Sequence, residues 1–275
     1  MRAFTSEWVK LSRRATLLGF GGIMIAFTLL FTILALEGAG GRSIDLDGSG
    51  SETSATTALL SLPEGSVFVV TDMAAFFGIV ALALFASNLA GEFHRGTIRM
   101  LFVTEPNRLA VLAGKLLALS SFVAAAIAAT LATSIGAGVL MADRAGVETA
   151  AWWTADGLTA IGTTYLDLTA AAFIPALIGA TIAVLTRSTT IAISVGLGWF
   201  ILAETLLGAF WGGLSRWGPA AASNAIAVGG TDRVGMMGAA APGISHATAI
   251  LLALGYSVAA LIITSTVLSR RDVTS

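Results

Sequence analysis

The 275-residue sequence contains no cysteine, which excludes disulfides, thiolate metal sites and cysteine nucleophiles. It has only two histidines, His94 and His246, so a histidine-based metal centre is not expected. Charge is also scarce, because Asp, Glu, Lys and Arg make up 11% of the residues, against about 25% in soluble domains. With a net charge of −1 and no basic tail, nothing points to nucleic acid as a partner. A chain this poor in charge is predicted to be an integral membrane protein.

Hydrophobic residues are abundant, at 56% of the chain with a mean hydropathy of +0.88. Six apolar segments are long enough to cross a hydrocarbon core about 30 Å thick, which takes about 20 helical residues. Their continuous apolar character indicates helices rather than the alternating strands of a barrel. The sequence therefore predicts one all-α transmembrane domain over residues 1–275, whose first span is an uncleaved anchor. The expected spans are 16–36, 66–90, 109–141, 157–186, 188–211 and 247–268.

The basic residues predict the orientation of these spans. If both termini are cytoplasmic, 11 of the 15 lysines and arginines lie on the inner side of the membrane. The positive-inside rule then favours a multi-pass protein of the cytoplasmic membrane with both termini inside. Glycines within the spans suit close helix packing. Examples are Gly136, Gly138, Gly179, Gly196 and Gly198.

The amino-terminal segment has the pattern of an amphipathic helix. Phe4, Trp8 and Leu11 fall on one helical face, while Lys10 and Arg13 fall largely elsewhere. This pattern predicts an interfacial helix whose three apolar side chains anchor it to the inner membrane surface. The alternative is an ordinary positively charged flank of the first span.

One charged stretch, "AGEFHRGTIRMLFVTEPNR" at residues 90–108, separates the second and third spans. The predicted topology places it in the cytoplasm, where a charged ridge of Glu92, Arg95 and Arg99 suits contact with another protein and Gly91 and Gly96 permit close backbone approach or a local break. A solvated loop that only enforces orientation is the alternative. The candidate contact residues are Glu92, His94, Arg95, Gly96, Thr97, Arg99, Pro106 and Arg108.

The same stretch resembles the signature of type-2 ATP-binding-cassette (ABC) exporter permeases. That signature has a Glu, then Gly-Thr, a pair of leucines, Pro-x-Arg and a later Gly-Lys-Leu. Two positions depart from it, because Phe102 replaces the second leucine and Asn107 replaces a Ser or Thr. The ending "LSRRDV" is also similar to the family's closing motif. The matching residues are Glu92, Gly96, Thr97, Leu101, Pro106, Arg108, Gly114, Lys115 and Leu116.

The resemblance implies a specific assembly. In that family the segment between helices 2 and 3 contains a coupling helix that docks on a separate ATPase subunit, and two permeases, identical or paralogous, work with two ATPases. ATP and Mg²⁺ are then bound by the partner, and the substrate is a hydrophobic drug, an antibiotic or a lipid-like molecule. This chain carries no phosphate-binding loop, since Gly114-Lys115 lacks a following hydroxyl and the upstream glycine. It is therefore expected to have no nucleotide-binding domain and no enzymatic activity of its own.

Three carboxylates lie within or beside apolar segments: Asp72, Asp167 and Glu204. Ionisable groups in such settings are costly, which makes a role in a translocation pathway or in gating the first hypothesis. They also define an alternative function, a proton-coupled secondary transporter that uses Asp167 and Glu204. The adjacent Ser245 and His246 are interpreted as cap and interface residues rather than a catalytic pair.

Overall fold

The computed structural model describes residues 2–39, 57–94, 108–204, 206, 210, 216–229 and 243–270. Of these residues 91% are helical, and this part of the chain contains no strand. The all-α fold predicted from the continuous apolar runs is therefore confirmed for the described residues. In lipid a helix satisfies its own backbone hydrogen bonds, so each run can form its element independently of the others.

Short and long helices are interspersed along the described part of the chain. Six elements have only three to six residues: α2, α5, the 3-10 helices η2 and η3, and the π-helices η1 and η4. The elements are α1 (Arg2–Leu11), α2 (Arg14–Thr16), η1 (Leu17–Gly21), α3 (Gly22–Ala39), η2 (Pro63–Val67), α5 (Phe68–Asp72), α6 (Ala74–His94), α8 (Arg108–Ala145), η3 (Ala150–Trp153), α9 (Ala155–Thr186), α10 (Thr189–Leu197), η4 (Gly198–Ala203), α13 (Pro219–Ala227) and α14 (His246–Arg270).

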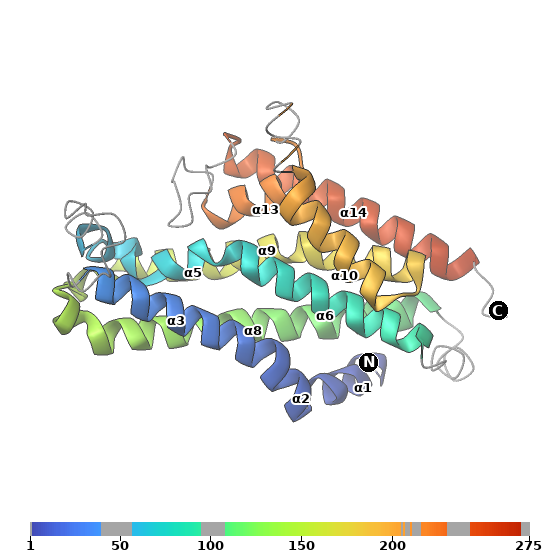
Figure 1. Cartoon of the computed structure of the whole chain (residues 1–275), viewed down its shortest axis with the longest axis horizontal. Coiled ribbons are helices and arrows are strands. Elements are labelled where there is room, and N and C mark those ends of the chain that lie inside the picture. Colours follow the sequence, from blue (N-terminus) through green and yellow to red (C-terminus); the bar gives the residue numbers. More distant parts are fainter. Residues whose placement is uncertain are drawn as a thin grey trace.

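Five helical stretches among the described residues are long and apolar enough to cross a membrane. Their lengths range from 20 to 37 residues, and the longer helices run side by side along the long axis of the molecule (Figure 1). The chain is thus a multi-pass helical membrane protein. The five stretches are Arg14–Ala39, Ala74–Phe93, Leu109–Ala145, Ala155–Thr186 and His246–Leu268.

Two of the six expected spans differ from the observed helices. The span expected at 66–90 is divided, because the chain leaves the helix at Met73 and α6 begins only at Ala74. The span expected at 188–211 is a shorter apolar helix, Thr189–Ala203, and several of its last expected residues lie outside the described part of the chain. Its passage into a π-helix at Gly198 could not be read from an apolar pattern.

Helix α9 occupies the centre of the bundle and packs most extensively on α6. A Cβ atom added to Gly179 of α9 would lie 2.8 Å from the backbone oxygen of Leu82, and one added to Gly78 of α6 would lie 2.9 Å from the Pro175 ring. The absence of side chains at these glycines lets the two helices approach closely. The prediction of close packing is confirmed at Gly179, as it is at Gly196, which also meets Leu82.

The other three glycines named from the sequence do not all have the same surroundings. Gly138 of α8 faces the Trp152 ring, 2.9 Å from a would-be Cβ, so it makes room for an aromatic side chain. No atom of the described residues lies within 4 Å of a Cβ built at Gly136 or Gly198, so the packing prediction is not confirmed for these two within the chain. An apolar sequence pattern does not distinguish a helix face that meets protein from one that meets lipid.

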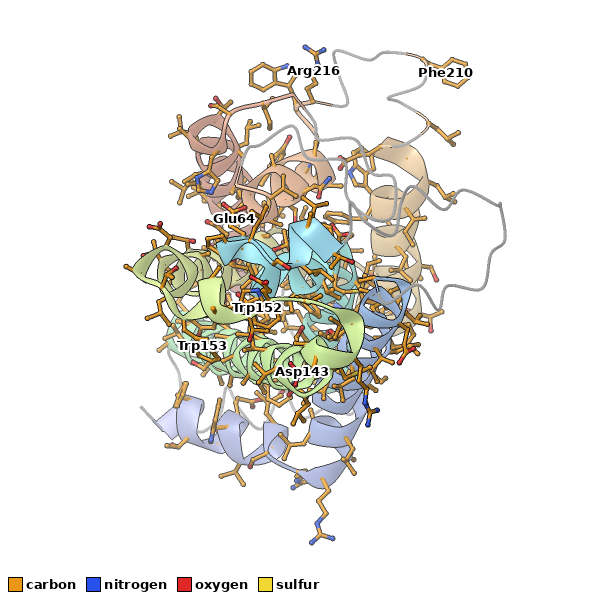
Figure 2. All side chains as sticks on the ribbon, turned by 90° about the vertical axis from the view of Figure 1, so that its left-hand side faces the viewer. Glu64, Asp143, Trp152, Trp153, Phe210 and Arg216 are labelled. Atoms are coloured by element: carbon orange, nitrogen blue, oxygen red, sulfur yellow. The ribbon has the colours of Figure 1, made fainter. Side chains whose placement is uncertain are left out.

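The outer end of the bundle, which is the end opposite the α6–α8 connection, has a small core of its own (Figure 2). Trp152 of η3 is 2% exposed, and its indole nitrogen donates a 2.8 Å hydrogen bond to the carbonyl of Leu60. Leu36 of α3 and Ala142 of α8 pack into the same cluster. The opposite end, where α6 ends and α8 begins, is termed the inner end and is the end predicted to be cytoplasmic.

Candidate functional site

The structure describes both flanks of the segment predicted to contact an ATPase, but not its middle. Glu92 lies in the last turn of α6, which ends at His94, and α8 begins at Arg108. Five predicted contact residues fall outside the described residues: Arg95, Gly96, Thr97, Arg99 and Pro106. The site is therefore built from what the flanks hold.

A buried lysine, Lys115, lies at the centre of the inner end. It is 4% exposed and sits in the second turn of α8. Its Nζ lies 2.7 Å from Glu92 Oε1, 2.9 Å from Glu7 Oε2 and 2.6 Å from Asn88 Oδ1. An ammonium group has three N–H donors, and three acceptors from two other helices surround this one.

A second lysine completes the arrangement. Lys10 Nζ lies 2.6 Å from Glu7 Oε1 and 3.4 Å from Glu92 Oε1, with its side chain 47% exposed. The two oxygens of Glu7 thus each face a different lysine. We call the five residues Glu7, Lys10, Asn88, Glu92 and Lys115 the inner charge cluster. It ties α1 to α6 and α8 through contacts between residues 82 and 108 positions apart.

The pKa values of Glu7 and Lys10, the two members on α1, show that interactions within the cluster outweigh the effect of burial on these groups. Burial alone raises the pKa of Glu7, but the charge of Lys115 and the hydrogen bonds from Lys10 and Lys115 outweigh it, so the pKa lies below its ordinary value. Burial lowers the pKa of Lys10, but its hydrogen bond to Glu7 and the charges of Glu7 and Glu92 raise it above the ordinary value. Both groups are charged at neutral pH. A buried group stays charged only where it has partners of opposite charge or hydrogen-bond partners.

Helix α1 is seated on α8 by apolar contacts as well as by the cluster. Leu11 is 2% exposed and belongs to the main core, whereas Trp8 is partly exposed and stacks on Phe4 with ring centroids 6.0 Å apart. The predicted amphipathic helix is therefore present, and Leu11 packs against protein. Its neighbour Trp8 keeps an exposed face, as an interfacial tryptophan does.

The turn between α9 and α10 also reaches the inner end. Arg187 ends α9 in a left-handed conformation with φ of 54°, and its guanidinium carbon lies 5.8 Å from the centroid of the Phe93 ring on α6. A cation over an aromatic face is attracted by the ring quadrupole. The end of α6 therefore contacts α1 and α8 on one side and the α9–α10 turn on the other.

The three carboxylates singled out from the sequence have separate environments. Asp167 Oδ1 lies 3.0 Å from His246 Nε2, which joins α9 to the start of α14. Asp72 is the last residue of α5, towards the outer end. Glu204 accepts hydrogen bonds from Trp199 Nε1 at 2.9 Å and from the backbone N–H groups of Ala220 and Ala221. Asp167 and Glu204 thus have different partners and do not form one site.

Glu204 is a helix cap, because Ala220 and Ala221 open α13 and their N–H groups have no partner within that helix. Glu204 is 7% exposed, and its carboxylate lies where a negative charge is favoured by the helix dipole. Gly218 makes room for it, since an added Cβ would lie 2.3 Å from Glu204 Oε2. The geometry gives this residue a structural role.

Replacing Glu204 with alanine is expected to lower the stability of the protein by about 1–2 kcal/mol, because it removes a charged helix cap. The measurement is thermal unfolding in detergent. Glu148→Ala, which removes an exposed carboxylate, is the matched control and is expected to leave the midpoint unchanged. Equal midpoints for the two variants would show that the cap contributes nothing.

Sequence reasoning missed most of the inner charge cluster. It assigned Glu92 to partner contact, placed Lys10 on the polar face of the amino-terminal helix and matched Lys115 to the permease signature, while Glu7 and Asn88 had no assigned role. One signal was available, since Lys115 is a lysine inside an apolar run and such residues need a partner. Nothing in the sequence indicated that this partner was 108 positions away in Glu7.

The fold and this cluster define a multi-pass helical membrane protein whose inner end is held by buried ion pairs. Comparison with protein families shows one match, over residues 55–274, to a family described as a protein of unknown function (DUF2705). The match covers most of the chain, which therefore belongs to this family. No curated protein matches the sequence.

Proposed function

We propose that the chain is the transmembrane subunit of an ATP-driven exporter of the type-2 ABC class, with six spans and a cytoplasmic coupling helix between the second and third spans. It would move a hydrophobic or amphipathic substrate across the cytoplasmic membrane with energy from a separate ATPase subunit. The working unit would hold two permeases and two ATPases. The observation that carries the proposal is the 2.7 Å contact between Glu92 and Lys115.

Glu92 and Lys115 both belong to the motif shared with exporter permeases. Their contact closes the base of the connection between α6 and α8, on the side predicted to face the ATPase. Because Lys115 also binds Glu7, a force applied to this connection would act on α1, α6 and α8 together. A coupling helix needs such a fixed base, because a flexible loop would deform locally and would not transmit the displacement to the membrane helices.

In such a transporter, ATP binding and substrate binding are thermodynamically linked to the conformation of the permease. ATP can shift the permease between inward-open and outward-open states only if the two states bind ATP or substrate with different affinity. In this proposal Arg95 and Arg99 supply charge complementarity to the ATPase, and Gly96 and Thr97 allow a close approach. The proposal thus assigns the charged segment to partner contact rather than to orientation alone.

Reversing the charge of Arg95 is expected to reduce association with the ATPase at least tenfold, because like charges across an interface cost several kcal/mol. The permease is co-expressed with candidate ABC ATPase subunits, and the readouts are co-purification and vanadate-sensitive transport in proteoliposomes. Gly96→Trp, which blocks close approach, is expected to act in the same direction.

The matched control is Arg144→Glu, at the outer end of α8. It makes the same charge change on the side predicted to lie away from the ATPase, and it is expected to leave association unchanged. If Arg95→Glu and Gly96→Trp both retain wild-type association and transport, the proposed joint is in the wrong place.

A second candidate function rests on the Asp167–His246 pair. An acid and a base 3.0 Å apart, with side chains 21% and 36% exposed, can exchange a proton while holding α9 and α14 together. This pair favours a proton-coupled secondary transporter, although Glu204 is committed to its helix cap. Transport that follows a proton gradient, ignores ATP and is lost in Asp167→Asn would overturn the exporter proposal.

A further inference from the structure

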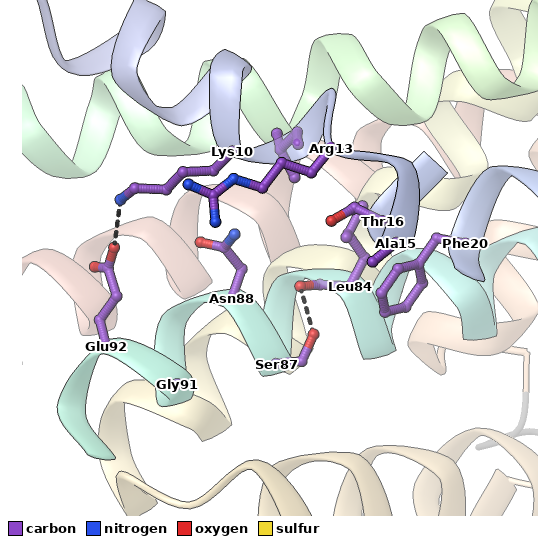
Figure 3. A pocket seen from close by; sticks show the side chains of 11 residues that line it. Lys10, Arg13, Ala15, Thr16, Phe20, Leu84, Ser87, Asn88, Gly91 and Glu92 are labelled. Atoms are coloured by element: carbon purple, nitrogen blue, oxygen red, sulfur yellow. Dashed lines mark hydrogen bonds and ion pairs between the residues drawn. The ribbon is translucent and has the colours of Figure 1, made fainter. Parts of the chain in front are cut away.

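A cavity of about 450 Å³ lies beside the inner charge cluster, between the amino-terminal elbow and α6 (Figure 3). The elbow consists of α1, α2 and η1, where the chain turns from α1 into the first membrane-spanning stretch. Sites for small molecules typically measure about 300–1,000 Å³. This cavity is large enough for a headgroup and is open to the surroundings on one side.

The charges around the cavity are unbalanced. Lys10, Arg13 and Lys115 contribute three positive charges, against the two carboxylates of Glu7 and Glu92. The carboxylates are already held by the two lysines. Arg13 forms no ion pair with any residue that the structure describes, and its guanidinium extends beside Lys10 above Asn88 (Figure 3). One singly charged anionic group bound next to Arg13 would bring the net charge of these five residues to zero.

The rest of the lining is mixed. Ser87 and Asn88 offer polar groups near the charges, while Leu84 and Phe20 form an apolar wall. Leu17 and Leu18, which precede Phe20 in η1, are exposed apolar side chains on the first span. A ligand that fits this lining has a negatively charged headgroup inside the cavity and an apolar part that extends along the first span.

We propose that this cavity binds the headgroup of an anionic phospholipid from the adjacent leaflet. Its phosphate accepts from Arg13 and Lys10, and its acyl chains run past Phe20 and Leu84 into the bilayer. Basic pockets at the inner face of helical membrane proteins are suited to such headgroups. Because the lipid contacts both α1 and α6, it holds the elbow against the inner charge cluster. This binding does not depend on the transport activity proposed above.

The test measures the stabilisation of the full chain by phosphatidylglycerol in detergent micelles, with phosphatidylcholine as the neutral lipid. Phosphatidylglycerol is expected to raise the unfolding midpoint and phosphatidylcholine to leave it nearly unchanged. Arg13→Ala is expected to weaken the phosphatidylglycerol response about fivefold, the amount expected for one arginine at an anionic lipid surface. Arg14→Ala, which removes a neighbouring exposed arginine outside the cavity, is the matched control.

A filling variant makes the test specific for the cavity. Ser87→Phe leaves every charge in place but occupies the space, and it is expected to abolish the phosphatidylglycerol response. Soluble glycerol phosphate, which lacks acyl chains, is expected to have no effect at the same concentration. Equal losses in Arg13→Ala and Arg14→Ala, a full response in Ser87→Phe, or full stabilisation by glycerol phosphate would each overturn the proposal.

Discussion

Lys115→Met is expected to destabilise the protein by about 3–5 kcal/mol, the loss typical of a buried ion pair that is broken by removing one partner. The methionine is similar in size, so the loss does not come from a cavity. It comes from Glu7 and Glu92, whose carboxylates would both lose their ion pair with the buried Lys115, while Lys10 is half-exposed and compensates less. The first consequence is release of α1 from α8.

The absence of cysteine allows α1 release to be measured directly. Leu11→Cys places a single thiol on a residue that is 2% exposed when α1 is docked. On this background Lys115→Met is expected to make the thiol react rapidly with a maleimide, while the parent reacts slowly. Unfolding midpoints of the two proteins give the stability difference.

Two further variants separate charge compensation from packing. Lys10→Met removes the exposed lysine and is expected to cost less than about 1 kcal/mol, as partly exposed ion pairs do. Adding Glu7→Gln to Lys115→Met is expected to recover part of the loss, because one unpaired carboxylate is removed. A double variant that is as unstable as the sum of its two single variants would show that Glu7 and Lys115 do not interact.

Gly179→Val is expected to destabilise the protein by about 1–3 kcal/mol or more, through overpacking between the two central helices. The would-be Cβ lies 2.8 Å from the backbone oxygen of Leu82 and 2.9 Å from its Cγ, so the new side chain meets the α6 backbone. Backbone cannot move aside as a flexible side chain can. Helices α6 and α9 would have to separate along the contact that organises the core.

The matched control lies on the same helix. Gly162 of α9 is exposed and has nothing within 4 Å of an added Cβ, so Gly162→Val is expected to be neutral or slightly stabilising through its higher helix propensity. Unfolding midpoints in detergent distinguish the two. Similar losses at both positions would mean that valine disturbs α9 itself rather than its contact with α6.

The contacts at Lys115 and Gly179 determine how a motion at the inner end would spread. The inner charge cluster joins α1, α6 and α8, while close packing at Gly78 and Gly179 joins α6 to α9. Helix α6 is the element common to both contacts. In the proposed exporter, a displacement beside Glu92 would therefore reach the central helix through packed atoms.

The apolar runs predicted the helical class and five of the membrane-crossing stretches well, because a long apolar run in lipid has no alternative to a helix. They could not predict the break at Met73, which separates α5 from α6 where the preceding η2 packs on α9. The start of α9 was placed two residues late. Thr154 caps it by accepting from Gly157 N at 3.3 Å, and a hydroxyl before a helix is a signal that can be read from sequence.

The sequence by itself determined that the chain is helical, rich in membrane-crossing segments and marked by one charged island at 90–108. It also identified Glu92 and Asp167 as ionisable residues that needed explanation. Only the tertiary structure decided their partners, Lys115 with Glu7 for the first and His246 for the second. Secondary structure and membrane partitioning depend on neighbours a few residues apart, whereas the pairing of buried charges depends on which helices pack together.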